Sequence, residues 1–93
     1  MRIEKEKIKE MRRCRREIDR IDNKILCLLS SRIQIVKKIR KIKKKNNINI
    51  IDRKREKEIF SRLIKKCSRL NLNKMFVMDL FKRIIKQSRK DQR

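Results

Sequence analysis

The sequence predicts an all-α fold, with one long helix and two shorter ones in each chain and two chains in an antiparallel homodimer. Three observations support this prediction. Apolar residues recur at helical spacing along most of the chain, and two short asparagine-containing segments interrupt that spacing. The first helical segment is also too long to bury its apolar face within a chain of 93 residues. We expect residues 1–93 to form a single domain.

The long helix is expected from about residue 4 to residue 45. Arg32 interrupts one of its two apolar rows, and a buried guanidinium needs an anionic partner. The sequence therefore predicts that an anion meets Arg32 or that the row opens there. The rows have the heptad spacing of helices that pair along a seam. One row contains Met11, Ile18, Ile25 and Ile39, and the other contains Cys14, Ile21, Leu28, Ile35 and Ile42.

Two shorter helices are expected at about residues 53–70 and 74–91. The segment NNINIID ends the long helix, and Asp52 is a good N-cap for the second. Glu56 lies in the first turn of that helix, where a negative charge favours the helix dipole. Asn73 follows a short turn and can cap the third helix.

The length of the first helix predicts the homodimer. About 40 helical residues extend roughly 60 Å, whereas a compact chain of this size has a radius of gyration of about 12 Å. Most of the helix would project with its apolar rows uncovered. A second copy related by a two-fold axis is the simplest cover.

Polar residues extend the apolar stripes of all three helices, as the lining of a cavity would. Arg15 and Lys43 are roughly 42 Å apart along one helix, so they cannot share a pocket within one chain. In an antiparallel pair that crosses near Leu26, however, Arg15 of the partner subunit falls between Arg32 and Lys43. Each dimer would then hold two cavities with three cations each, suited to a small dianion. The remaining polar positions are Asp52, Glu56, Ser88 and Gln92.

The charge is strongly positive, with 33 Lys and Arg against 11 Asp and Glu and a net charge of +22. This balance favours nonspecific binding to polyanions. A dedicated nucleic-acid function is less favoured, because the basic residues are spread along the chain and the only aromatic residues are Phe60, Phe76 and Phe81.

Other composition features exclude several classes. There is no apolar run of about 18 residues, so we expect no membrane segment and a cytoplasmic protein. Cys14, Cys27 and Cys67 lack the spacing of metal ligands and are expected to be reduced. The chain also has no histidine and no glycine-rich loop. Ala, Gly, His, Pro, Thr, Trp and Tyr are all missing, which favours an engineered or selected reduced alphabet.

Four parts of the sequence together resemble the all-helical chorismate mutases of the AroQ class: RREIDRIDNKILCLLSSR, the later Lys43, IIDRKRE and IIKQSRKDQ. The resemblance covers about residues 12–92. Members of this class are intertwined homodimers of three-helix chains with two equivalent active sites. The resemblance implies the conversion of chorismate, a small dianionic substrate, to prephenate, an isomerisation that needs no cofactor.

The resemblance also implies a role for each polar position. Arg32 and Arg15 of the partner subunit would hold the two carboxylates of chorismate. Lys43 would contact a carboxylate and the ether oxygen, and Gln92 would donate a hydrogen bond to that oxygen. Glu56 and Asp52 would hold the substrate hydroxyl and neighbouring groups. The rest of the implied lining is Arg55 and Ser88, with Ile39 and Ile85 as apolar walls.

Three alternatives stay open from the sequence. An isochorismate–pyruvate lyase uses a similar cationic pocket on the same scaffold. A non-catalytic basic helical dimer could bind nucleic acid instead. A purely structural coiled coil is disfavoured, because Arg32 breaks its seam.

Overall fold

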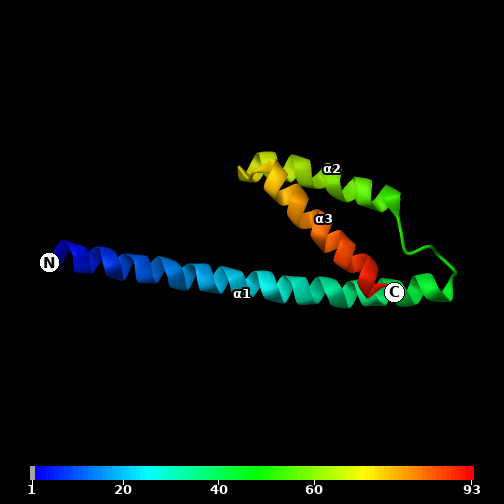
Figure 1. The fold of residues 1–93 in the computed structure, drawn as a ribbon, viewed down its shortest axis with the longest axis horizontal. Helices are drawn as coiled ribbons and strands as arrows, with labels where there is room; N and C mark the ends of the chain where they lie inside the picture. The colour runs from blue at the N-terminus through cyan, green and yellow to red at the C-terminus, as the bar shows by residue number, and fades with distance from the viewer. Residues whose placement is uncertain (1) are drawn as a thin grey trace. The chain divides into compact units, whose positions relative to one another are not determined.

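The computed structural model describes residues 2–93, which form three helices (Figure 1). Helix α1 comprises Arg2–Lys45, α2 comprises Arg53–Leu70 and α3 comprises Lys74–Asp91. Residues 2–93 contain no strand, so the predicted all-α class with three helices is confirmed. The chain divides into two units, one ending at Arg32 and the other comprising Ile33–Arg93.

The first unit is a single helical segment, the N-terminal part of α1. Its apolar side chains are exposed, with exposed fractions of 54% for Ile18, 51% for Ile25 and 69% for Leu28. A lone helix has no second element to cover an apolar face, and in α1 as a whole only Val36 is buried. The heptad rows that the sequence predicts are therefore uncovered within one chain.

An asparagine in a left-handed conformation ends α1. Asn47 has φ 54°, and the backbone N–H of Ile48 donates to the carbonyl of Lys43 at 2.8 Å. This hydrogen bond, from residue i+5 to residue i, and the positive φ of Asn47 identify a Schellman motif. Glycine is the usual residue at the position with positive φ. The chain has no glycine, and asparagine is among the few other residues that adopt this conformation readily.

Helix α2 begins and ends with side-chain and backbone caps. Asp52 is its N-cap, as predicted, and its Oδ1 accepts a hydrogen bond from the backbone N–H of Arg55 at 2.9 Å. Asn71 follows the helix with φ 56°, and Leu72 N–H donates to the carbonyl of Cys67 at 3.0 Å. The same asparagine-based Schellman motif therefore ends both α1 and α2.

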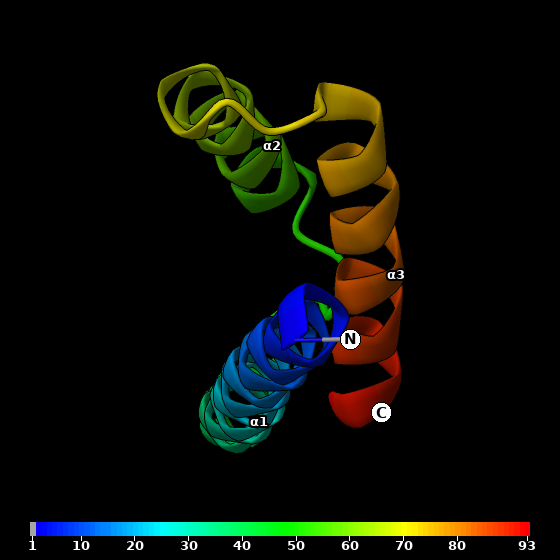
Figure 2. The ribbon, with the colours of Figure 1, turned by 90° about the vertical axis from the view of Figure 1, so that its left-hand side faces the viewer.

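Helix α3 follows after the short turn Asn71–Asn73. Asn73 is its N-cap, as predicted, because its Oδ1 accepts from the backbone N–H of Phe76 at 3.0 Å. Figures 1 and 2 both show α2 and α3 joined at this turn and diverging from it. The last turn of α3 is thereby carried to the C-terminal part of α1, in the second unit.

The second unit has a small core. Its buried apolar side chains come from all three helices, and Cys67 is the most buried, at 2% exposed. The buried apolar set among the described residues is Val36, Ile59, Cys67, Val77 and Ile85. None of the helices in residues 2–93 is long and apolar enough to cross a membrane.

Candidate functional site

Lys43 and Gln92, which are 49 residues apart in sequence, meet in the second unit. The Lys43 ammonium donates to Gln92 Oε1 at 2.9 Å and to the carbonyl oxygen of Ile50 at 2.8 Å. Both side chains are half-buried. An ammonium has three N–H donors, so one remains for a ligand.

Local structure explains how these groups come together. Helix α1 ends two residues after Lys43, and the Schellman motif at Asn47 turns the chain back so that the Ile50 carbonyl reaches the ammonium. Gln92 directly follows α3, where its backbone N–H donates to the carbonyl of Ser88 at 3.1 Å. The two helix ends therefore present a cation and an amide to each other.

A hollow of about 350 Å³ lies beside this pair. That volume is at the lower end of the range for small-molecule sites. Its lining contains four basic residues and no acidic one, so the hollow suits a small anion. The basic residues of this lining are Arg40, Lys43, Lys44 and Arg93.

A bidentate ion pair joins α2 to α3. Arg89 Nε donates to Glu56 Oε2 at 3.0 Å, and Arg89 Nη2 donates to Glu56 Oε1. The Glu56 side chain is only 19% exposed and that of Arg89 28%. Glu56 lies in the first turn of α2 and Arg89 in the last turn of α3, the ends at which the helix dipoles favour these charges.

Arg89 is a site residue that the sequence reasoning missed. It lies four residues after Ile85, which is 7% exposed, so the helical stripe that led to Ser88 and Gln92 also includes it. A basic residue in a chain with 33 of them carries little signal by itself. Only the contact with Glu56 distinguishes it.

Replacing Arg89 with methionine is expected to destabilise the fold by about 1–2 kcal/mol, because it leaves the partly buried Glu56 carboxylate without its charged donor. Urea unfolding followed by circular dichroism measures the loss. Arg83→Met is the matched control, since Arg83 is exposed on α3 and has no ion pair within residues 2–93. Equal stability of the two variants would show that the ion pair contributes nothing.

The other predicted residues of the second unit have different surroundings. Asp52 is exposed and its carboxylate caps α2. Arg55 lies on the exposed surface, where its guanidinium is 3.5 Å from Glu58. Ser88 is buried and its Oγ donates to the carbonyl of Ile84 at 2.9 Å. Of the two predicted apolar walls, Ile85 is buried and Ile39 is 40% exposed.

Arg15 and Arg32 belong to the first unit. Arg15 is exposed, and Arg32 is half-buried. The second unit thus brings together Lys43 with Gln92, and Glu56 with Arg89.

One carboxylate near the C-terminal end of α3 is incompletely satisfied. Gln87 Nε2 donates to Asp91 Oδ1 at 3.1 Å. Asp91 Oδ2 is buried and has no hydrogen-bond partner within residues 2–93. The residue adjacent to Gln92 therefore has a buried carboxylate oxygen whose hydrogen-bonding capacity is unsatisfied.

The described residues form an all-helical protein with a small hollow, lined by basic residues, at the ends of α1 and α3. Comparison with known families makes the class specific. The family model described as chorismate mutase type II matches residues 14–93. The chain belongs to this family, and its enzyme class is therefore that of an isomerase.

Individual relatives agree with the family. A chorismate mutase from Methanocaldococcus jannaschii is 34% identical over 82 residues, which cover 88% of this chain and 83% of the relative. A bifunctional chorismate mutase/prephenate dehydratase from Aquifex aeolicus is 43% identical over 58 residues, covering 62% of this chain and 16% of the relative. A second bifunctional chorismate mutase/prephenate dehydratase, from Buchnera aphidicola subsp. Acyrthosiphon pisum, is 40% identical over 74 residues, covering 80% of this chain and 19% of the relative. No solved structure matches the chain.

Proposed function

We propose that the protein converts chorismate to prephenate in an active site built around Lys43 and Gln92. The observation that carries this proposal is the 2.9 Å hydrogen bond between these two side chains beside a hollow lined by basic residues. Membership of the family supplies the reaction. The site supplies the groups that the reaction needs.

The reaction is a unimolecular rearrangement that needs no nucleophile. One ether C–O bond breaks while a C–C bond forms within the same molecule. The enzyme must hold the enolpyruvyl arm folded over the ring, which lowers the entropic part of the barrier. We assign the two carboxylates to Arg32 and to Arg15 of the partner subunit, since a guanidinium can bind a carboxylate through two parallel hydrogen bonds.

Lys43 has two roles in this proposal. Negative charge develops on the ether oxygen as the C–O bond breaks, and the remaining N–H of the ammonium is available to stabilise it. The ammonium also orients the Gln92 amide. Because Oε1 accepts from Lys43, the Nε2 end keeps its two donors, and one can reach the same ether oxygen.

Glu56 is proposed to accept a hydrogen bond from the substrate hydroxyl. Arg89 occupies one lone pair on each carboxylate oxygen, and each oxygen keeps a second for another donor. The ion pair therefore fixes the orientation of the Glu56 carboxylate and leaves it able to accept further hydrogen bonds. We assign Asp52, Arg55 and Ser88 to the polar surroundings, and Ile39 and Ile85 to the apolar walls.

We propose that the working form is an intertwined antiparallel homodimer. The support is the uncovered apolar face of α1, a helix of 44 residues with one buried side chain. Monomeric soluble proteins rarely expose continuous apolar surface on this scale. A second copy would cover the face and bring Arg15 of the partner subunit to each site.

The cell context follows from the same proposal. Three free cysteines are typical of a reducing compartment, which supports a cytoplasmic location. The names of the bifunctional relatives combine chorismate mutase with prephenate dehydratase, an enzyme that consumes prephenate. This pairing supports a place in aromatic amino acid biosynthesis.

Product identification tests the proposal directly. Purified protein incubated with chorismate is expected to yield prephenate, detected by loss of chorismate absorbance and by NMR of the product. Arg32→Ala prepared identically is the control and is expected to be inactive. Salicylate and pyruvate formed from isochorismate, with no prephenate from chorismate, would instead identify a lyase.

A further inference from the structure

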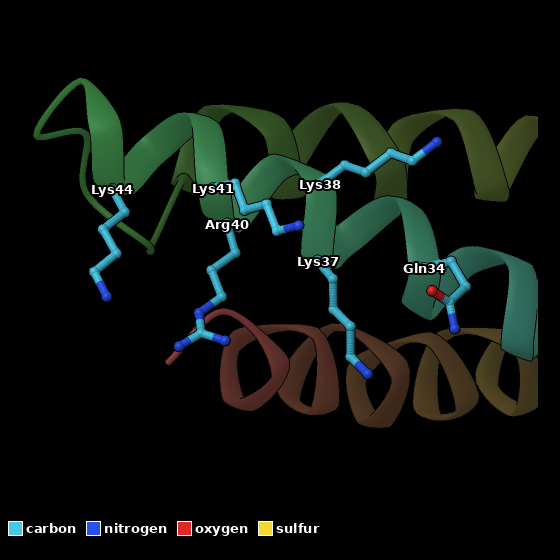
Figure 3. Close-up of a pocket in the computed structure, with 6 residues that line it drawn as sticks. All are labelled: Gln34, Lys37, Lys38, Arg40, Lys41 and Lys44. Carbon is cyan, nitrogen blue, oxygen red and sulfur yellow. The ribbon is translucent and has the colours of Figure 1, made fainter.

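The C-terminal part of α1 carries a group of five cations, of which Lys37, Lys38 and Lys41 lie outside the hollow beside Lys43 and Gln92. Figure 3 shows them along one stretch of the helix, with Lys37, Arg40 and Lys44 extending to one side of it and Lys38 to another. We call this set the basic ridge. Together with the neutral Gln34, its members line one shallow groove: Lys37, Lys38, Arg40, Lys41 and Lys44.

No acidic side chain balances the ridge. Between Asp22 and Asp52 the sequence contains no Asp or Glu at all. None of the five ridge cations has a hydrogen bond or an ion pair within residues 2–93. Like charges three and four residues apart destabilise a helix, and an anionic partner would relieve that repulsion.

Most of the ridge faces away from the two apolar rows of the same helix. Residues two positions apart on an α-helix point about 200° apart. Lys37, Lys41 and Lys44 each stand two positions after a residue of these rows, namely Ile35, Ile39 and Ile42. These lysines therefore stay accessible when another surface covers the rows.

We propose that the basic ridge binds duplex nucleic acid through the phosphate backbone. Lys37 and Lys44 are about 10 Å apart along the helix axis, and a duplex presents one negative charge per about 1.7 Å of its axis. Several phosphates thus lie within reach. The ridge has no aromatic side chain to stack on an unpaired base, which favours a duplex over a single strand. Contacts to phosphate alone carry no sequence information, so binding is independent of sequence.

The matched test compares two triple variants. Lys37→Gln, Lys38→Gln and Lys41→Gln remove three ridge charges. Lys54→Gln, Lys57→Gln and Lys65→Gln remove three exposed charges from a groove on α2 that also contains Glu58. Glutamine and lysine have similar helix propensities, so both variants keep their helices. Helical content measured by circular dichroism verifies this point.

The readout is fluorescence anisotropy of a labelled 20-base-pair DNA duplex, titrated with the full-length protein across a series of NaCl concentrations. The ridge variant is expected to lose at least about tenfold in affinity at 0.1 M salt. The slope of log affinity against log salt is expected to become shallower by about 2.7, since each phosphate contact contributes about 0.9. The α2 variant is expected to lose less than about threefold, because its three lysines lie outside the ridge and make none of the proposed phosphate contacts.

Three outcomes would overturn the proposal. Equal losses in the two variants would show that total charge, and not the ridge, sets the affinity. Absence of duplex binding by the wild-type protein at low salt would show that duplex nucleic acid is not the partner of the ridge. Tighter binding to phosphatidylserine vesicles than to the duplex, lost in the ridge variant, would assign the ridge to an anionic membrane surface. Chorismate turnover is measured independently, so failure here is distinct from failure of the proposed reaction.

Discussion

Replacing Lys43 with methionine is expected to lower kcat for chorismate by about 10²–10³-fold or more. Removal of one preorganised donor to a developing oxyanion typically costs that much. Here the same change also frees the Gln92 amide, because the ammonium is the group that holds Oε1. One substitution therefore affects both proposed donors to the ether oxygen.

Steady-state kinetics with chorismate measures the effect, and Lys45→Met is the matched control. Lys45 is two residues away, exposed at the end of α1, and outside both the hollow and the basic ridge. Its variant is expected to stay within about twofold of the wild-type kcat, since it contacts no reacting group. A Lys43→Met enzyme that keeps more than a tenth of the wild-type kcat would show that Lys43 does not have the proposed catalytic role.

Mixing two inactive variants is expected to restore activity if each site is shared between subunits. In the proposed homodimer, Arg15→Met and Lys43→Met are each expected to inactivate both sites. A mixed dimer has one doubly defective site and one site in which Lys43 and Arg15 of the partner subunit are both intact. Random exchange of subunits makes about half of the dimers mixed, so about one quarter of the wild-type activity is expected.

The experiment unfolds the two variants together in urea and refolds them as a mixture. Each variant refolded alone provides the baseline, and wild-type protein refolded in the same way provides the maximum. Analytical ultracentrifugation establishes the assembly that is assayed. A mixture that stays at the baseline, with dimers present, would show that Arg15 does not serve the site of its partner. A monomeric active protein would overturn the dimer proposal itself.

The positions of the individual helices in this chain are determined largely by residues that are close together in the sequence. Periodicity at 3.5–3.6 residues predicts three helices, and three are present among residues 2–93. Asp52 and Asn73 are predicted as N-caps from their type and position alone, and both accept the expected backbone hydrogen bond. An N-cap hydrogen bond joins two residues that are three positions apart. Both residues can therefore be identified from the sequence, without the tertiary structure.

The helix ends show where local prediction is weaker. The sequence indicates that NNINIID interrupts α1 but does not indicate which asparagine turns the chain. Asn47 adopts the left-handed conformation, and its neighbour Asn46 instead donates its side-chain N–H to the carbonyl of Ile42 at 2.8 Å. Two adjacent identical residues take different roles because only one of them stands at the position that the Schellman motif requires.

The sequence by itself determined the helical class, the caps, the uncovered apolar rows of α1 and the candidate residues Lys43, Glu56 and Gln92. These follow from spacing along one helix or from residue type, and both are local properties. The tertiary structure alone decided that Lys43 donates to Gln92 and to the Ile50 carbonyl, and that Arg89 holds Glu56. The Lys43–Gln92 and Arg89–Glu56 contacts join residues that are 49 and 33 positions apart, and Ile50 is 7 positions from Lys43. Their geometry depends on how α3 packs back toward α1 and α2, because a helical period specifies the face of a residue but not its partner on another helix.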